Sequence, residues 1–304
     1  MTIRGYFPSQ HEYEILLDIA LYRLLSVELL HKLGHGTPET IRKALRMLRR
    51  QCLVGSTAPS TKPAPEKAEV GTPHLFWLSP KGDRTLNELH GHRVAIGATR
   101  RFGKDNEIEH RLGIVAIHMA FRAWAKATGK RDISFVCDFE PGSPGRGKVT
   151  TIRYNKQEAT PGGLIKTAAS YLPDGYARFA FPDPTLPPQL MVVEFERGGG
   201  RGDLSMFFRG RKNRPPKLDG IREAAEHDVV EQAKALGSPA PYLIVFGTEE
   251  TRDRALNGRW PDRGAEVWRR FFIKSLPEIE AEGADFQNGW WRVDGSRRDL
   301  YAGR

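Results

Sequence analysis

A chain of 304 residues, of which 39% are hydrophobic and 10% aromatic, is long enough to bury one large core or two modest ones, which excludes a disordered chain. Lys and Arg number 47 against 37 Asp and Glu, which gives a formal net charge of +10 and a pI near 9.7. This excess of positive charge favours a polyanionic partner, without choosing between DNA, RNA and an anionic membrane.

The cysteines and the first residues indicate the cellular compartment of the protein. Only two cysteines occur, Cys52 and Cys137, and each lies in an apolar stretch, which predicts small buried side chains and no disulfide. The first residues, MTIRGYFPSQHEYE, contain no apolar signal core, and no apolar run reaches the roughly 18 residues of a membrane span. The sequence therefore predicts a cytoplasmic protein that does not bind membranes.

The N-terminal region has the spacing of three short helices. Apolar residues recur at helical spacing over residues 11–24, and Ser26 is a suitable N-cap for a second helix that ends at a glycine. Thr37, followed by a proline, begins a third helix that runs to about Cys52. Three helices with a short glycine-containing turn predict a helix-turn-helix.

The third helix has an apolar face and a basic face. The apolar face carries Ile41, Ala44, Leu45, Leu48 and Cys52. The basic face carries Arg42, Lys43, Arg46, Arg49 and Arg50. Exposed helix faces are often charged, but the single acid of this helix, Glu39, lies in the first turn, where the helix dipole favours it. We therefore expect the basic face to contact DNA phosphates and guanine edges in the major groove.

Two short strands follow the third helix. CLVGS and HLFWLSPKG have strand character, and the proline-rich TAPSTKPAPEKAEVGTP between them has none. Helices followed by a β-hairpin predict a winged helix-turn-helix over residues 8–90, whose wing reaches the DNA backbone. The stretch LNELHGHRVAIGATRRFGKD predicts a connector, centred on residues 91–104, to a second domain at residues 105–304.

The second domain mixes helices and strands. NEIEHRLGIVAIHMAFRAWAKATG and KLDGIREAAEHDVVEQAKALG predict helices, whereas DISFVCDFE, GYARFAF, QLMVVEFER and APYLIVFGT predict strands. GAEVWRRFFIKSLPEIEAEG predicts closing helices. The chain as a whole is therefore expected to be of the α/β class, with α+β mixing.

Two acids stand on neighbouring strands of this domain. Asp174, after Pro173, opens one strand, and Glu194 lies inside the next, nearly all-apolar strand, where an ionised carboxylate needs a cation. This order of elements is that of a PD-(D/E)XK core, a restriction-endonuclease-like mixed sheet in which two carboxylates hold Mg²⁺ or Mn²⁺. A Pro-Asp pair alone is weak support, because Asp183 and Asp262 also follow prolines.

Such cores place a lysine two residues after the second acid, and here that position is Glu196. Strand alternation puts Glu194 and Glu196 on one face, which is either a solvated face or a metal-binding one. Lys217, at the start of the following helix, is the candidate for the missing lysine. A phosphate-tracking loop is predicted from Arg201, Arg209, Arg211, Lys212 and Arg214.

The start of the first helix of this domain carries two further candidates. Glu109 is a possible extra metal ligand, and His110 is a possible general base. A surface acid beside a partly buried histidine explains the same residues equally well.

Several motifs together resemble a known family. LHKLGHGTPETIRKALRMLRRQCLV, HLFWLSPKG, EHRLGIVAIHMAF, LPDGYARF, VVEFERG and KLDGI resemble the replication-relaxation family, which includes MobC-like plasmid mobilisation proteins. The resemblance implies a winged helix that recognises an origin-like duplex and a nuclease-type domain that nicks the strand, with mobilisation or replication proteins as further partners. It places the family's functional residues on His110, Asp174, Glu194 and Lys217.

Two functions stay open from the sequence. The first is a metal-dependent DNA nickase or relaxase. The second is a non-catalytic DNA-binding protein, either a transcriptional regulator or a relaxosome accessory protein, with a degenerate nuclease fold. A covalent mechanism would use Tyr171 or Tyr176, which flank Asp174. The HGH motif at residues 90–92 lies in the connector and is not interpreted as a metal site.

Overall fold

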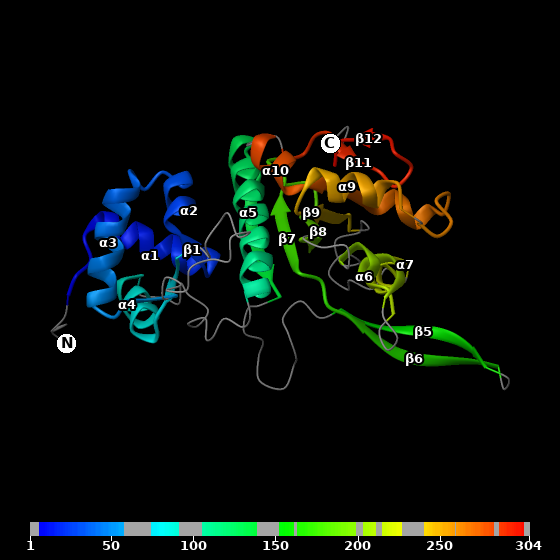
Figure 1. Ribbon diagram of the computed structural model, residues 1–304, viewed down its shortest axis with the longest axis horizontal. Coiled ribbons are helices and arrows are strands. Elements are labelled where there is room, and N and C mark those ends of the chain that lie inside the picture. The colour runs from blue at the N-terminus through cyan, green and yellow to red at the C-terminus, as the bar shows by residue number, and fades with distance from the viewer. Residues whose placement is uncertain are drawn as a thin grey trace, which may run out of the picture. The chain divides into compact units, whose positions relative to one another are not determined.

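In the computed structural model, the described residues are 6–57, 74–90, 105–138, 152–160, 163–198, 203–210, 215–226, 240–258, 260–282 and 286–300. The chain divides into two compact units, Met1–Leu112 and Gly113–Arg304. The predicted connector at 91–104 and most of the predicted wing tip, 58–73, lie outside the described residues. Both units combine helices with strands, so the chain is of the mixed α/β class (Figure 1). Along the described stretches, helices with the length and apolar character of a membrane span are absent.

The N-terminal unit contains short helices around a small sheet. Its described helices are α1 (Gln10–Tyr22), α2 (Val27–Lys32), α3 (Pro38–Arg50) and α4 (Pro80–His90). Its described strands, β1 (Leu25–Ser26), β2 (Val54–Ser56) and β3 (Leu75–Leu78), form an antiparallel sheet in the order β1-β3-β2. The three helices and the two strands predicted here from the sequence are confirmed.

Polar side chains set where the first three helices begin. Ser9 accepts a hydrogen bond from the backbone N–H of Glu12, and the Glu12 carboxylate accepts one from the N–H of Ser9, which is a capping box. Ser26 caps α2, and Thr37 caps α3. The N-caps predicted at these last two residues are therefore confirmed.

Helix α3 packs its apolar face and exposes its basic face. Ile41, Ala44, Leu45 and Leu48 are buried, whereas the basic residues of the opposite face are exposed. The prediction that Cys52 is buried with the apolar face is wrong. The helix ends at Arg50, and Cys52 is exposed with a φ of 57°, so the chain has left the helical path before it. Cys137 is buried, as predicted, and no disulfide joins it to Cys52.

Helix α4 contains residues that the sequence assigned to the connector. The hydroxyl of Ser79 accepts a hydrogen bond from the N–H of Gly82, and Pro80 occupies the first helical position, where its missing N–H costs nothing. Leu86 is fully buried. The Ser-Pro-Lys-Gly sequence, predicted as the end of the strand HLFWLSPKG, therefore contains the start of a helix, and the strand ends at Leu78.

The C-terminal unit is built on a mixed sheet, with seven strands among its described residues, in the order β12-β11-β10-β9-β8-β7-β4. The strands are β4 (Arg131–Cys137), β7 (Gly175–Ala180), β8 (Gln189–Glu196), β9 (Tyr242–Phe246), β10 (Phe271–Ser275), β11 (Trp290–Trp291) and β12 (Arg297–Arg298). β8, β9 and β10 are parallel to one another, and β7 is antiparallel to both of its neighbours. Between β4 and β7 the chain forms a separate hairpin, β5 (Ile152–Thr160) and β6 (Gly163–Tyr171), seen in Figure 1 as a long projecting arm.

Helices cover both faces of this sheet. Helices α5 (Asp105–Ala127) and α10 (Leu276–Glu282) contribute to the core on one face. Helices α6 (Asp203–Arg209), α7 (Lys217–Glu226) and α9 (Glu249–Leu256), with the short 3-10 helix η1 (Glu266–Arg270), contribute to the core on the other. The unit therefore has three layers, helix, sheet and helix.

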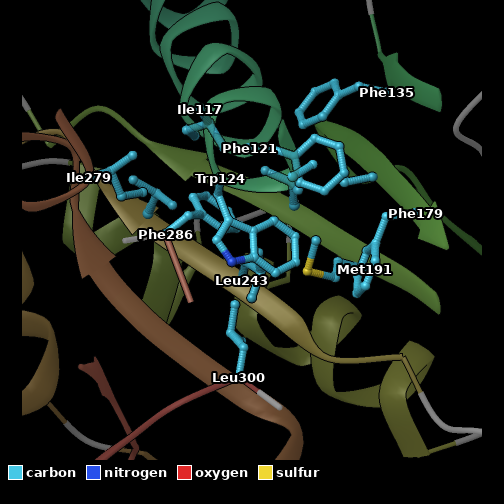
Figure 2. Close-up of a cluster of buried hydrophobic side chains, with 14 of the residues drawn as sticks. Ile117, Phe121, Trp124, Phe135, Phe179, Met191, Leu243, Ile279, Phe286 and Leu300 are labelled. Atoms are coloured by element: carbon cyan, nitrogen blue, oxygen red, sulfur yellow. The ribbon is translucent and has the colours of Figure 1, made fainter. Parts of the chain in front are cut away.

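The core beneath α5 is rich in aromatic rings. Figure 2 shows Phe121 and Trp124 of α5 among the surrounding rings of Phe179 and Phe286. The ring of Trp124 meets that of Phe179 edge to face, with centroids 5.0 Å apart. This packing holds α5 against the sheet.

The central strand β8 divides its side chains between the two cores. Met191, Val193 and Phe195 belong to the core on the α5 side, whereas Leu190 and Val192 belong to the core on the α7 side. Because side chains alternate along a strand, Glu194 and Glu196 lie on the α7 side.

The closing region differs from its prediction. The segment GAEVWRRFFIKSLPEIEAEG, predicted as helices, contains strand β10 between η1 and α10. Phe271 and Ile273 of β10 are fully buried and pair in parallel with Tyr242 and Ile244 of β9. A short strand that is buried on both faces has no alternation of polar and apolar residues, so its pattern does not distinguish it from a buried helical turn.

Candidate functional site

The first acid of the candidate site stands where β7 begins. Gly175, the first residue of β7, is opposite Val193 of β8, so β8 continues past the end of its neighbour. The N–H of Phe195, beyond that end, donates a hydrogen bond of 2.8 Å to Oδ2 of Asp174. Asp174 is 8% exposed. The end of the β7–β8 ladder thus fixes the position of this carboxylate.

The second acid lies inside β8. Glu194 is 0% exposed, on the face of the sheet that α7 covers, and its neighbour in β9 is Ile244. The solvated-face interpretation of this residue is therefore wrong. Glu196, two residues further along the same face, is half-buried, with a side chain that is 17% exposed. A carboxylate as deeply buried as that of Glu194 requires a cation or several donors nearby.

That cation is Lys217, the first residue of α7. Its Nζ lies near three carboxylates, at 3.4 Å from Asp174 Oδ2, 2.8 Å from Glu194 Oε2 and 2.5 Å from Glu196 Oε1. Pro215 and Pro216 precede the helix, and side chains on a helix lean toward its N-terminus, so Lys217 extends back from the helix end toward β8. We call these four residues the carboxylate–lysine cluster.

The electrostatics of the cluster keep Lys217 charged. Burial alone would lower the pKa of the Lys217 ammonium, but Asp174, Glu194 and Glu196 raise this pKa well above its usual range. The lysine therefore stays an ammonium throughout the physiological range. One ammonium among three carboxylates leaves an excess of two negative charges if all three are ionised.

Oxygen ligands and excess negative charge suit a hard divalent cation. Among the described residues, no group of three or more metal-ligating side chains is arranged around one ion position. Mg²⁺ sites that act on phosphates usually take one or two carboxylates from the protein and the remaining ligands from water and substrate. Asp174 and Glu194 fit such a pair, and these two are the residues that would hold the ion.

The other candidates from the sequence are His110, Glu109, Tyr171 and Tyr176. His110 and Glu109 lie in the first part of α5, before the boundary at Leu112, and so belong to the N-terminal unit; their roles at the site stay predictions. Tyr171 is buried in the apolar core on the α7 side. Burial, together with the nearby Tyr242, raises the pKa of Tyr176 far above its usual range, so its phenol is a poor nucleophile.

The basic face of α3 borders a surface pocket in the N-terminal unit. The pocket measures about 550 Å³, and Arg42, Arg46 and Arg49 are among the residues that line it. His74 and Phe76, from the region of β3, line it as well. Burial lowers the pKa of His74, and the nearby Arg49 lowers it further, which favours the neutral imidazole at this position.

The predicted phosphate-tracking loop is only partly described. Arg209 is the last residue of helix α6 and not part of a loop, because the apolar side chains before it pack as a helix against α7. Arg201, Arg211, Lys212 and Arg214 lie outside the described residues. Arg209 lines a second surface pocket, of about 490 Å³, together with Arg254 and Asn257. Sequence reasoning missed these last two, since no pattern links α6 to the distant α9.

Compared with protein-family models, with curated proteins and with solved structures, the chain matches none of them. The resemblance to the replication-relaxation family stays a prediction, and the function rests on the geometry of the chain itself.

Proposed function

We propose that the chain is a DNA-binding protein similar to replication-relaxation and mobilisation proteins, which recognises an origin-like duplex and nicks or relaxes it with Mg²⁺ or Mn²⁺. In this proposal the N-terminal unit is a winged helix and the C-terminal unit is a PD-(D/E)XK-like domain. The observation that carries the proposal is the carboxylate–lysine cluster, in which Lys217 contacts both predicted metal ligands, Asp174 and Glu194.

Each side chain of the cluster has its own role in the proposed phosphodiester cleavage. Asp174 and Glu194 would hold the divalent ion, which when bound would activate a water and neutralise charge on the phosphate. Lys217 orients the water or stabilises negative charge that develops on the phosphate, because its ammonium stays charged. Glu196 contacts Lys217 at 2.5 Å and holds its ammonium in place. The lysine that such cores take from the second strand is thus supplied by α7.

The N-terminal unit supports the DNA-binding half of the proposal. Helix α3 presents exposed basic residues, and the antiparallel pair β2–β3 follows it in the position of a wing. A basic helix face beside a hairpin is suited to duplex DNA, where the helix reads the major groove and arginines contact phosphates.

A second function is favoured by one feature of the same cluster. Lys217 already pairs with all three acids, and Glu196 stands at the position where PD-(D/E)XK cores have their lysine. A cluster that is partly neutralised by its own lysine also suits a non-catalytic DNA-binding regulator or relaxosome accessory protein. The two functions share the N-terminal unit and differ only in the chemistry of the second.

A plasmid relaxation assay separates the two functions. Supercoiled plasmid that carries the cognate origin is incubated with the full chain and Mg²⁺ or Mn²⁺, and nicked product is measured on a gel. Wild type is compared with Asp174→Ala and Glu194→Ala. Asp183→Ala is the matched control, because Asp183 also follows a proline but is exposed, and its carboxylate accepts hydrogen bonds from the N–H and hydroxyl of Thr185.

We expect nicking by wild type and Asp183→Ala, and none by the two cluster variants. Undiminished nicking by Asp174→Ala would exclude the cluster as the active site. Unchanged plasmid with wild type at both metals, together with retained sequence-specific binding, would establish the non-catalytic function instead.

A further inference from the structure

A second surface pocket lies in the C-terminal unit, and none of its lining residues belongs to the carboxylate–lysine cluster. It is formed by α6 and the end of α9 and measures about 490 Å³, a size that suits a small ligand or one nucleotide. Its lining residues are Leu204, Ser205, Phe208, Arg209, Arg254, Asn257 and Gly258. The pocket therefore combines two guanidinium groups, a hydroxyl, an amide and an aromatic ring, and none of its described lining side chains is acidic.

The two arginines of this pocket are available to pair with an anionic ligand. Arg209 and Arg254 are both exposed, and neither has an ion-pair partner among the described residues. Each lies in the last turn of its helix, where the helix dipole favours a cation. The dipole explains why each helix has an arginine in its last turn, but it does not explain why both arginines line the same pocket.

Backbone oxygens at the end of α9 are covered by donors. The guanidinium of Arg263 donates to the carbonyl oxygens of Leu256 and Gly258 at 2.8 and 2.6 Å. The amide of Asn257 donates to the carbonyl oxygen of Asp253 at 3.0 Å. A helix C-terminus normally repels anions through such carbonyls. Here three of them already accept hydrogen bonds from side chains of the protein, which weakens this repulsion at the end of α9.

The aromatic wall of the pocket is rigid. The ring of Phe208 packs edge to face on Trp260, with centroids 5.5 Å apart and an interplanar angle of 87°. A side chain at position 258 would place its Cβ 2.7 Å from this ring, so Gly258 is required for the packing. A ring that is held in one orientation loses little entropy when a base packs against it.

We propose that this pocket binds a nucleotide of a single-stranded nucleic acid, with the phosphate between Arg209 and Arg254 and the base against Phe208. Aromatic rings beside arginines are the usual elements of sequence-tolerant strand binding. The proposal rests on the proposed nucleic-acid function of the chain, and it assigns to the C-terminal unit the capture of a separated strand. None of its residues belongs to the carboxylate–lysine cluster.

The test is the binding of a fluorescently labelled oligothymidine of about 15 nucleotides to the full chain, followed by anisotropy at fixed salt. We expect Arg254→Ala and Phe208→Leu each to raise the Kd about fivefold or more. Arg298→Ala, which removes an exposed arginine from β12 of the same unit, is the matched control and leaves the Kd unchanged. Because Arg254 is exposed, its variant keeps the fold, which thermal unfolding by circular dichroism checks.

Two outcomes overturn the proposal. One is an equal Kd for wild type, Arg254→Ala and Phe208→Leu. The other is displacement of the strand by thymidine monophosphate at concentrations as low as those of unlabelled strand, which would make the ligand a free nucleotide. Plasmid nicking by the same variants separates this proposal from the proposed function. If wild type never nicks the plasmid but Arg254→Ala weakens strand binding, the pocket is supported and the proposed nickase function is not. If wild type nicks the plasmid but Arg254→Ala binds the strand as tightly as wild type does, the pocket is rejected and the proposed function is not.

Discussion

The ammonium of Lys217 lies 2.8 Å from a carboxylate oxygen of Glu194, whose side chain is 0% exposed. The two residues come from different elements, the start of α7 and the interior of β8. The lysine also contacts Asp174 and Glu196, so one cation holds together the start of β7, two positions of β8 and the N-terminus of α7. The candidate site and the packing of α7 on the sheet therefore depend on the same side chain.

Replacement of Lys217 by methionine should destabilise the C-terminal unit. The variant keeps an apolar stem but leaves Glu194 buried without its cation. Breaking a fully buried pair costs about 3–5 kcal/mol, and because the Lys217 side chain is 32% exposed, we expect about 2 kcal/mol. Urea unfolding at neutral pH measures the change in the free energy of unfolding.

The control for this prediction is the double variant Lys217→Met with Glu194→Gln. Removing the buried charge as well should restore part of the lost stability, because the remaining amide is cheaper to bury than a carboxylate. If the effects of Lys217→Met and of Glu194→Gln, each measured alone, add up to the effect of the double variant, the ion pair contributes nothing to stability.

Glu278 should make the stability of the C-terminal unit depend on pH in the acid range. Burial alone would raise the pKa of Glu278, but the N–H of Ser275 and the guanidinium of Arg252 lower it below the ordinary value of 4.5. A carboxylate with a lowered folded-state pKa stabilises the fold above its ordinary pKa, and this contribution is lost as the pH falls through the lowered value.

We therefore expect Glu278→Gln to lose about 2–3 kcal/mol of unfolding free energy at pH 7, because Arg252 is buried and keeps its charge. The gap in unfolding free energy between variant and wild type should narrow as the pH falls below the ordinary pKa of 4.5, because Glu278 then becomes protonated first in the unfolded and then in the folded state of the wild type. Urea unfolding across this pH range measures the gap. Glu266→Gln, at an exposed position of η1, is the control and should stay within about 0.5 kcal/mol of wild type at every pH. A gap that does not change with pH would contradict the assignment to Glu278.

Much of the N-terminal unit and both strand acids could be predicted from the sequence, because their signals are local. Ser26 and Thr37 are caps, α3 has a clear division of faces, and a proline directly before Asp174 marks the start of a strand. The sequence indicated that Lys217 could reach Glu194, but it could not establish the contact. The distance between the two side chains depends on how α7 packs over the sheet.

The rest could not be predicted because its signals are tertiary. Strand β10 has no alternation, since helices cover both faces of the sheet and bury most of its side chains. Cys52 has an apolar neighbourhood in sequence, yet it falls after the last turn of α3. The pocket between α6 and α9 joins Arg209 to Arg254 only through the packing of two helices on one core.

Gly113 should tolerate no side chain, whereas Gly220 should. A methyl group at Gly113, inside α5, would overlap the ring of Phe195 in β8. A methyl group at Gly220, inside α7, would meet only Tyr171, at an ordinary contact distance of 3.7 Å. We expect Gly113→Ala to lose about 1–3 kcal/mol through overpacking, and Gly220→Ala to gain about 0.5–1 kcal/mol from helix propensity. Thermal unfolding of the two variants measures both changes in stability. A gain in stability for Gly113→Ala would show that α5 does not lie this close to β8.

The exposed basic face of α3 should determine the salt dependence of duplex binding. Each phosphate contact releases counterions, so Arg46→Ala and Arg49→Ala should weaken binding to duplexes of any sequence and each reduce the slope of log K against log salt by about one. Titration of a labelled duplex at several salt concentrations gives the slopes. Arg84→Ala, which removes an exposed arginine of α4 in the same unit, is the matched control and should keep the wild-type slope. Wild-type slopes for both α3 variants would mean that another surface of the protein contacts DNA, because neither arginine has a role in the buried core that could hide the loss of a contact.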